Sequence, residues 1–195
     1  MGSRVLVVGA GTGVGNNVLR SLRAGDADLT LIGGHHDRFA LKKSSADRHY
    51  LIHESTHPHF LESLRRVIER EQVDVLIPTS DRDVRRCSDL REEIPCRLFL
   101  PSPRVIALCQ DKYELTRHLR ARGVGAPITY PLEDLASVGP IFDRFAPAEL
   151  VWCRVRSGNG STGAIPVKTA AQAQAWIGYW AQMRGVPSRS FTLWE

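Results

Sequence analysis

The chain has 195 residues, of which 43% are hydrophobic and 24% charged, and its formal net charge is +5. This composition is typical of a soluble globular protein, and no apolar run approaches the roughly 20 residues that a membrane-spanning helix needs. Arginines supply most of the positive charge and are spread along the chain. That distribution suits phosphates and other anionic ligands, but it lacks the concentrated basic face typical of nucleic-acid-binding proteins.

Apolar strands and amphipathic helices alternate over the first hundred residues. Short apolar runs predict strands at residues 4–8, 29–32, 50–52, 73–77 and 97–100. Two glycines close the second run, and residues 57–72 carry apolar side chains at helical spacing. Continuous apolar strands separated by helices indicate a parallel sheet covered on both faces. We therefore expect a doubly wound, Rossmann-like α/β domain over residues 1–104.

The second half of the chain mixes helices with a hairpin. Residues 111–122 read as a helix, and residues 150–155 and 164–167 read as two strands joined by a glycine-rich turn. A capping box, Thr169-x-x-Gln172, opens a further helix. We expect an α+β domain over residues 105–195. Because the chain stops in a strand at 191–194, we also expect it to be a fragment of a longer protein.

The first glycine motif is Gly9-Ala10-Gly11-Thr12-Gly13-Val14-Gly15, directly after the first strand. Such a turn brings the backbone close to the next helix, or to a phosphate at its N-terminus, so Gly11, Thr12 and Gly13 are candidate cofactor contacts. The spacing G-x-x-x-G-x-G occurs in short-chain dehydrogenases, but no acidic residue closes the second strand and no tyrosine has a lysine four residues on. We interpret the motif mainly as a tight turn, with an NAD(P)-linked oxidoreductase as the alternative.

The second glycine motif follows Arg154 and Arg156 and runs over residues 157–163. It lies between two strands and is not followed by Lys-Ser/Thr, which excludes a Walker-type P-loop. The backbone N–H groups of such a loop can fold over phosphate oxygens, and the two arginines add positive charge.

Several motifs together, in this order, resemble the ATP-grasp family, in particular its carbamoyl-phosphate-synthase large-subunit-like branch. The matching segments are Asp74-Val75-Leu76-Ile77-Pro78-Thr79-Ser80-Asp81, Asp111-Lys112, Gly123-Val124-Gly125-Ala126-Pro127, Cys153-Arg154-Val155, Gly158-Asn159-Gly160-Ser161-Thr162-Gly163 and Phe191-Thr192-Leu193-Trp194-Glu195. The resemblance covers nearly the whole chain. It implies a Rossmann-like leading domain followed by the opening part of an ATP-grasp domain.

The resemblance also implies roles for individual residues. Lys112 would contact the ATP phosphates, and Arg154 stands where the family usually has a second phosphate-binding lysine. Glu195 would lie at the adenine hinge. The phosphate lid would be formed by Gly158, Gly160, Ser161 and Gly163. Contact with the substrate would come from Thr79, Ser80 and Asp81, for which a helix N-cap is an equally good interpretation.

The function that the resemblance implies is an ATP-dependent carboxylate–amine (C–N) ligase acting through an acyl phosphate, with ATP and Mg²⁺ as cofactors. The family's magnesium-binding Glu and Asn fall beyond residue 195, so we expect the 195-residue chain not to catalyse, and no residue in it is assigned as catalytic. The expected partners are small-molecule carboxylates and amines, not nucleic acid or a membrane, and a homodimer stays open. A non-catalytic truncated homologue is a further alternative.

Histidines and cysteines suggest no metal site. His53, His57 and His59 lie close together in sequence, but no cysteine or carboxylate completes a set with the usual ligand spacing. The four cysteines are widely spaced and form no C-x-x-C pair. We expect reduced thiols in a cytoplasmic protein.

Overall fold

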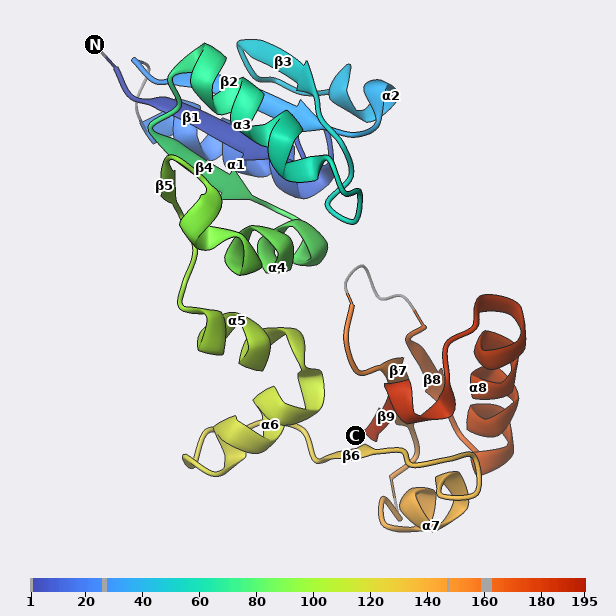
Figure 1. The fold of residues 1–195 in the computed structure, drawn as a ribbon. Helices are drawn as coiled ribbons and strands as arrows, with labels where there is room; N and C mark the ends of the chain where they lie inside the picture. Colours follow the sequence, from blue (N-terminus) through green and yellow to red (C-terminus); the bar gives the residue numbers. More distant parts are fainter. Residues whose placement is uncertain (1, 26–27, 147, 159–162) are drawn as a thin grey trace. The chain divides into compact units, whose positions relative to one another are not determined.

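The computed structural model describes residues 2–25, 28–146, 148–158 and 163–195. The chain divides into two compact units, Met1–Ile106 and Ala107–Glu195, which are described separately below (Figure 1). None of the helices in these described ranges combines the length and the apolarity needed to cross a membrane.

The first unit is built on a five-stranded sheet with the strand order β3-β2-β1-β4-β5. Its strands are β1 (Arg4–Val8), β2 (Thr30–His35), β3 (Arg48–Leu51), β4 (Val75–Pro78) and β5 (Arg97–Leu98). Every neighbouring pair is parallel. The order reverses between β1 and β4, as in doubly wound folds, so the predicted α/β class is confirmed.

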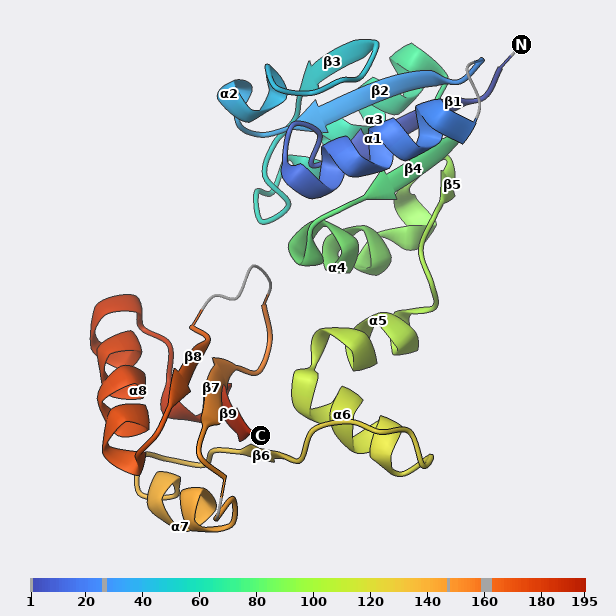
Figure 2. The ribbon, with the colours of Figure 1, turned by 180° about the vertical axis from the view of Figure 1, so that it is seen from behind.

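Helices cover both faces of this sheet (Figures 1 and 2). Helix α1 (Gly13–Gly25) lies on one face, where Leu19 packs against the strands. Helices α3 (Phe60–Glu71) and α4 (Asp81–Asp89) pack with the opposite face. Alternate residues of β1 are therefore divided between two apolar cores. The unit is completed by α2 (Arg38–Leu41) and the short 3₁₀ helix η1 (Arg91–Glu93).

Two boundaries differ from the expectation. β2 does not end before Gly33 and Gly34 but includes both. The two residues are glycines because a side chain at either position would press against neighbouring atoms. A Cβ on Gly33 would lie 2.8 Å from the Ala10 Cβ atom. Helix α3 begins at Phe60 and not at residue 57. His57 precedes a proline, and a residue in that position is disfavoured from helical backbone angles.

The buried carboxylate of Glu71 links helix α3 to strands β1 and β3. Glu71, the last residue of α3, is only 2% exposed and accepts hydrogen bonds from Arg4, Arg48 and Tyr50. The Arg48 Nη1 atom lies 2.6 Å from the carboxylate. Burial alone would raise the pKa of Glu71, but the Tyr50 hydrogen bond and the two arginines outweigh it and hold the pKa below its ordinary value.

The second unit contains a four-stranded antiparallel sheet with the order β6-β9-β7-β8. Its strands are β6 (Thr129–Pro131), β9 (Phe191–Trp194), β7 (Val151–Val155) and β8 (Ile165–Val167). β7 and β8 pair as the predicted hairpin. This separate sheet with its helices confirms the expected α+β character.

Helices α7 (Val138–Asp143) and α8 (Ala170–Arg184) pack on this sheet around a core that includes Val151, Ile177 and Phe191. The chain reaches the sheet through α5 (Pro103–Gln110) and α6 (Lys112–Arg120), and the 3₁₀ helix η2 (Ser188–Ser190) precedes β9. Thr169 caps α8 as predicted, because its hydroxyl accepts a hydrogen bond from the Gln172 amide at 3.2 Å. The Gln172 side chain accepts from the Lys168 amide at 2.8 Å, one residue before the cap.

Candidate functional site

The second glycine loop leaves β7 and returns to β8, and the described residues fix both of its ends. Gly158 has φ = +126° and Gly163 has φ = +71°, angles that side chains rarely adopt. A Cβ on Gly163 would also lie 2.5 Å from the Val155 Cγ2 atom. The Trp176 indole on α8 donates a hydrogen bond to the Gly163 carbonyl at 3.0 Å. The predicted lid residues Gly160 and Ser161 lie outside the described residues.

The start of α6 is joined to the beginning of this loop. An isolated antiparallel bridge links Asp111 to Ser157, and the Lys112 amide donates to the Arg156 carbonyl at 3.1 Å. The Lys112 amino group donates to the Gly158 carbonyl at 2.5 Å. The predicted phosphate-binding lysine therefore lies at the beginning of the glycine loop.

An ion pair reinforces the same junction. The Arg156 guanidinium reaches both carboxylate oxygens of Asp111, at 2.7 to 2.9 Å, and lies 3.6 Å from a Glu114 oxygen. The hydrogen bond to Asp111 raises the pKa of Arg156. Burial alone would raise the pKa of Asp111, but the Arg156 hydrogen bond and two backbone amides hold it below its ordinary value. Both groups therefore stay charged at neutral pH.

Arg154 occupies a different environment on β7. Its guanidinium lies over the Trp194 ring, 4.6 Å from the ring centre, and Trp194 stacks on Trp152 with the ring centres 5.7 Å apart. Its Nε atom is buried and has no hydrogen-bond partner among the described residues. Burial lowers the pKa of Arg154, although a guanidinium stays protonated in proteins. Glu195, the predicted adenine-hinge residue, directly follows β9 and is exposed.

The first glycine turn is held by hydrogen bonds among its own residues and to Asn16 of α1. The Gly11 amide donates to the Asn16 side chain at 3.2 Å, and the Thr12 hydroxyl donates to the Gly9 carbonyl at 2.7 Å. That hydroxyl also accepts from the Gly15 amide at 3.1 Å. A Cβ on Gly11 would overlap the Ala40 carbonyl, so packing requires glycine there whether or not a phosphate binds. Gly13, the first residue of α1, is exposed. These contacts favour the interpretation of the motif as a structural turn.

Thr79, Ser80 and Asp81 follow β4 at the same carboxyl edge of the sheet as the glycine turn, which follows the neighbouring β1. The Thr79 hydroxyl donates to the Val8 carbonyl at 2.7 Å. Ser80 caps α4 and accepts from the Asp83 amide at 3.1 Å. Asp81 is the first residue of α4. The N-cap interpretation therefore describes Ser80, and the Thr79 hydroxyl supports the end of β1.

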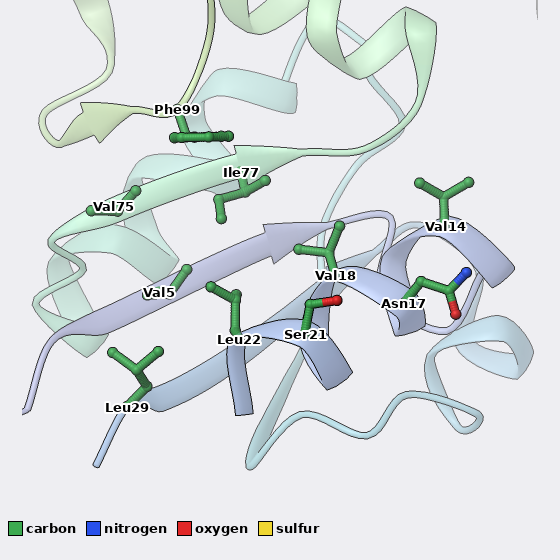
Figure 3. Close-up of a pocket in the computed structure, with 10 residues that line it drawn as sticks. All are labelled: Val5, Val14, Asn17, Val18, Ser21, Leu22, Leu29, Val75, Ile77 and Phe99. Atoms are coloured by element: carbon green, nitrogen blue, oxygen red, sulfur yellow. The ribbon is translucent and has the colours of Figure 1, made fainter. Parts of the chain in front are cut away.

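An apolar hollow of about 570 Å³ lies elsewhere in the first unit, between α1 and the sheet (Figure 3). Val18 and Leu22 of α1 face Val5 and Ile77 of the strands there, and Phe99 lies at its edge. Among the residues that the structure describes, Asn17 and Ser21 are the polar ones in its lining. None of the described residues that line it carries a charged side chain, which makes this part of the hollow unsuited to a phosphate.

The contacts at the second glycine loop include several that no sequence pattern signalled. The Asp111–Arg156 ion pair, the Trp176–Gly163 hydrogen bond and the stacking of Arg154 on Trp194 all depend on tertiary proximity. The sequence motif indicates Asp111 only as the neighbour of Lys112. Around the histidines, His53 stacks on His57 at 4.2 Å between ring centres, and no group of three or more His, Cys, Asp or Glu among the described residues is placed to hold a metal.

The sequence matches no protein-family model, and no curated protein matches it significantly. Solved structures do match. The biotin carboxylase domain of Hydrogenobacter thermophilus 2-oxoglutarate carboxylase, solved as a dimer with MgADP, ADP and bicarbonate, superimposes with a TM-score of 0.68 at 16% identity. That match covers 100% of this chain and 44% of the carboxylase chain.

Two further structures extend the comparison. N5-carboxyaminoimidazole ribonucleotide synthetase from Thermotoga maritima is similar with a TM-score of 0.62 at 18% identity, covering 99% of this chain and 46% of its own. L-amino acid ligase from Bacillus licheniformis is similar with a TM-score of 0.64 at 10% identity, covering 98% and 43%. The chain thus spans less than half the length of these structures. It has the fold of the N-terminal portion of ATP-grasp enzymes, as the sequence motifs predicted.

Proposed function

We propose that this chain, with the fold of the N-terminal portion of ATP-grasp enzymes, supplies phosphate-binding residues to the ATP site of a carboxylate–amine ligase. The observation that carries the proposal is the contact of the Lys112 amino group with the Gly158 carbonyl at 2.5 Å. This contact puts a lysine at the beginning of a glycine loop whose backbone N–H groups suit phosphate oxygens. Complexes of similar enzymes with ADP and ATP support the choice of nucleotide.

In this proposal Lys112 and the 158–163 loop, including Gly160 and Ser161, hold the phosphates. Arg154 adds a second cation and Glu195 contacts the adenine. The guanidinium of Arg154 is half-buried and keeps its positive charge, which suits an anionic ligand. Mg²⁺ bound with the nucleotide would help to neutralise the phosphate charge. No group of three or more His, Cys, Asp or Glu is placed to hold a metal among the described residues, and we assign it no ligand among them.

The proposed reaction has two steps. A carboxylate oxygen attacks the γ-phosphorus of ATP, which gives an acyl phosphate and releases ADP. An amine nitrogen then attacks the acyl carbon, the amide bond forms, and phosphate leaves. The protein's part is to position the groups and to neutralise phosphate charge, so no protein nucleophile is needed. We further propose small-molecule carboxylate and amine substrates, with Thr79, Ser80 and Asp81 near the acceptor, and a homodimer as in the carboxylase structure.

Titration of the isotopically labelled chain with MgATP and, separately, with NADH tests the proposal by backbone-amide NMR. MgATP is expected to shift the amide signals of Lys112, Ser157 and Gly158 and to leave residues 9–15 unchanged. Shifts confined to residues 9–15 on addition of NADH would contradict the proposal and favour the oxidoreductase alternative. The absence of any shift with either nucleotide would favour a non-catalytic homologue.

A further inference from the structure

Arg156 lies one residue beyond β7, and its side chain points to α6. It makes a forked contact with Asp111, with three N–O distances between 2.7 and 2.9 Å. The two side chains are 31% and 23% exposed, so the pair is partly shielded from water. Charge-assisted, forked arginine–carboxylate contacts of this kind are short and fix orientation as well as distance.

Asp111 also caps α6. Its Oδ1 atom accepts hydrogen bonds from the Tyr113 and Glu114 amides, each at 3.1 Å. The same carboxylate therefore joins the first turn of α6 to Arg156. The backbone adds a second link, because the Lys112 amide donates to the Arg156 carbonyl at 3.1 Å. These links fix the backbone at residues 111–114, from which the Lys112 side chain extends.

Two cations, Arg156 and Lys112, lie at this junction. Arg156 has Asp111 at 2.7 Å and a Glu114 oxygen at 3.6 Å, so carboxylates within the protein balance its charge. The Lys112 amino group contacts the neutral carbonyl of Gly158. A phosphate that approached the loop would therefore meet an arginine already engaged by carboxylates. These carboxylate contacts favour a structural task for Arg156. In the proposed function, the ligand-contacting task belongs to Lys112.

We infer that Arg156 is a positioning residue for the proposed ATP site: its ion pair with Asp111 holds Lys112 beside Gly158. This inference rests on the proposed function. It predicts that Arg156 and Lys112 act on phosphate binding as one unit. Loss of Arg156 weakens the binding of ATP, and it adds nothing when Lys112 is already absent.

Binding of MgATP and of adenosine to four forms of the chain tests the inference: wild type, Arg156→Met, Lys112→Met and the double variant. We expect Arg156→Met to weaken MgATP binding by roughly tenfold or more, a typical loss for a hydrogen bond to a charged group. Adenosine binding is expected to stay within about twofold, because adenosine has no phosphate for Lys112 to contact. The double variant is expected to bind MgATP as Lys112→Met does.

Arg117→Met is the matched control. Arg117 lies on the same helix and pairs with Glu114 at 2.6 Å, and no hydrogen bond joins it to the loop residues that the structure describes. It should bind MgATP like the wild type, and Arg156→Lys should recover part of the lost affinity since lysine keeps the charge but not the fork.

The outcomes separate the two proposals. If the wild type binds MgATP and Arg156→Met binds it equally well, or if the Arg156 and Lys112 effects simply add, the inference fails while the proposed function stands. If the wild type binds no MgATP, the proposed function fails, and the inference fails with it. Amide hydrogen exchange without nucleotide then tests the junction by itself: Arg156→Met should speed exchange at Lys112 and Tyr113 and leave α8 unchanged. Equal exchange would show that Arg156 does not hold the start of α6.

Discussion

The Lys112 amino group lies 2.5 Å from the Gly158 carbonyl, although the two residues are 46 positions apart in the sequence. Lys112 opens α6 and Gly158 opens the glycine loop after β7. The contact exists because an isolated backbone bridge between Asp111 and Ser157 brings the two segments together. A cation is thereby held beside Gly158, and in the proposed function this cation contacts the phosphates.

Replacing Lys112 by methionine should weaken MgATP binding by about 10- to 100-fold. This range corresponds to the loss of a hydrogen bond between charged partners. Isothermal titration calorimetry measures it directly. Lys168→Met is the control, because Lys168 is exposed and its loss changes the net charge equally. Equal weakening in both variants would mean that only overall charge matters and that Lys112 makes no specific contact.

Much of the fold could be predicted from the sequence because several of its strands, such as β1 and β9, are largely buried apolar runs. β1 and β9 follow the predicted residues closely, since each is bounded by polar or glycine residues that end the apolar pattern. The extent of β2 could not be predicted. Its two glycines signal a strand end locally, but they are required by the close approach of Ala10 and Ile52, which only the folded unit reveals.

The candidate site was predictable only in part, for a related reason. Lys112 and the glycine loop could be assigned because each stands in a short motif. The Asp111–Arg156 ion pair could not, because it joins residues 45 positions apart whose types are common throughout the chain. The stacking of Arg154 on Trp194 depends on the register between β7 and β9, which the sequence does not specify. The roles of these residues in nucleotide binding stay predictions.

Replacing Gly163 by alanine should lower the free energy of unfolding by about 1–3 kcal/mol. A side chain at φ = +71° is strained, and its Cβ would press against Val155 at 2.5 Å. Urea denaturation followed by tryptophan fluorescence reports on this unit, because all four tryptophans lie in it. Gly125→Ala is the control, since nothing lies within 4 Å of a Cβ there. The prediction is wrong if the two alanine variants are equally stable.

Replacing Glu71 by glutamine should lower the free energy of unfolding by about 2 kcal/mol, because Arg4 and Arg48 lose a charged acceptor. Glu69→Gln, an exposed change on the same helix, should have little effect. The two variants are compared by urea denaturation followed by far-UV circular dichroism. Similar losses of stability in both variants would show that the buried Glu71 carboxylate contributes no more to the free energy of unfolding than the exposed Glu69.

Lowering the pH should remove the contribution of Glu71 to stability. Its pKa in the folded state lies below its ordinary value of 4.5. The stabilisation is therefore complete above about pH 4.5 and is lost as the pH falls through the lower, folded-state pKa. The difference in unfolding free energy between wild type and Glu71→Gln should shrink in that acidic range. A difference that is the same at pH 7 and at acidic pH would contradict this assignment.

Arg154 should tolerate lysine better than methionine in binding MgATP. Lysine keeps the positive charge that the proposed phosphate contact needs, whereas methionine removes it. Lysine lacks the planar group that lies over Trp194, so Arg154→Lys should still lose up to about 1 kcal/mol of stability. Calorimetric titration of both variants and urea denaturation followed by tryptophan fluorescence separate the two effects. If Arg154→Met binds MgATP as well as the wild type but unfolds more readily, Arg154 serves the stacking with Trp194 and not the nucleotide.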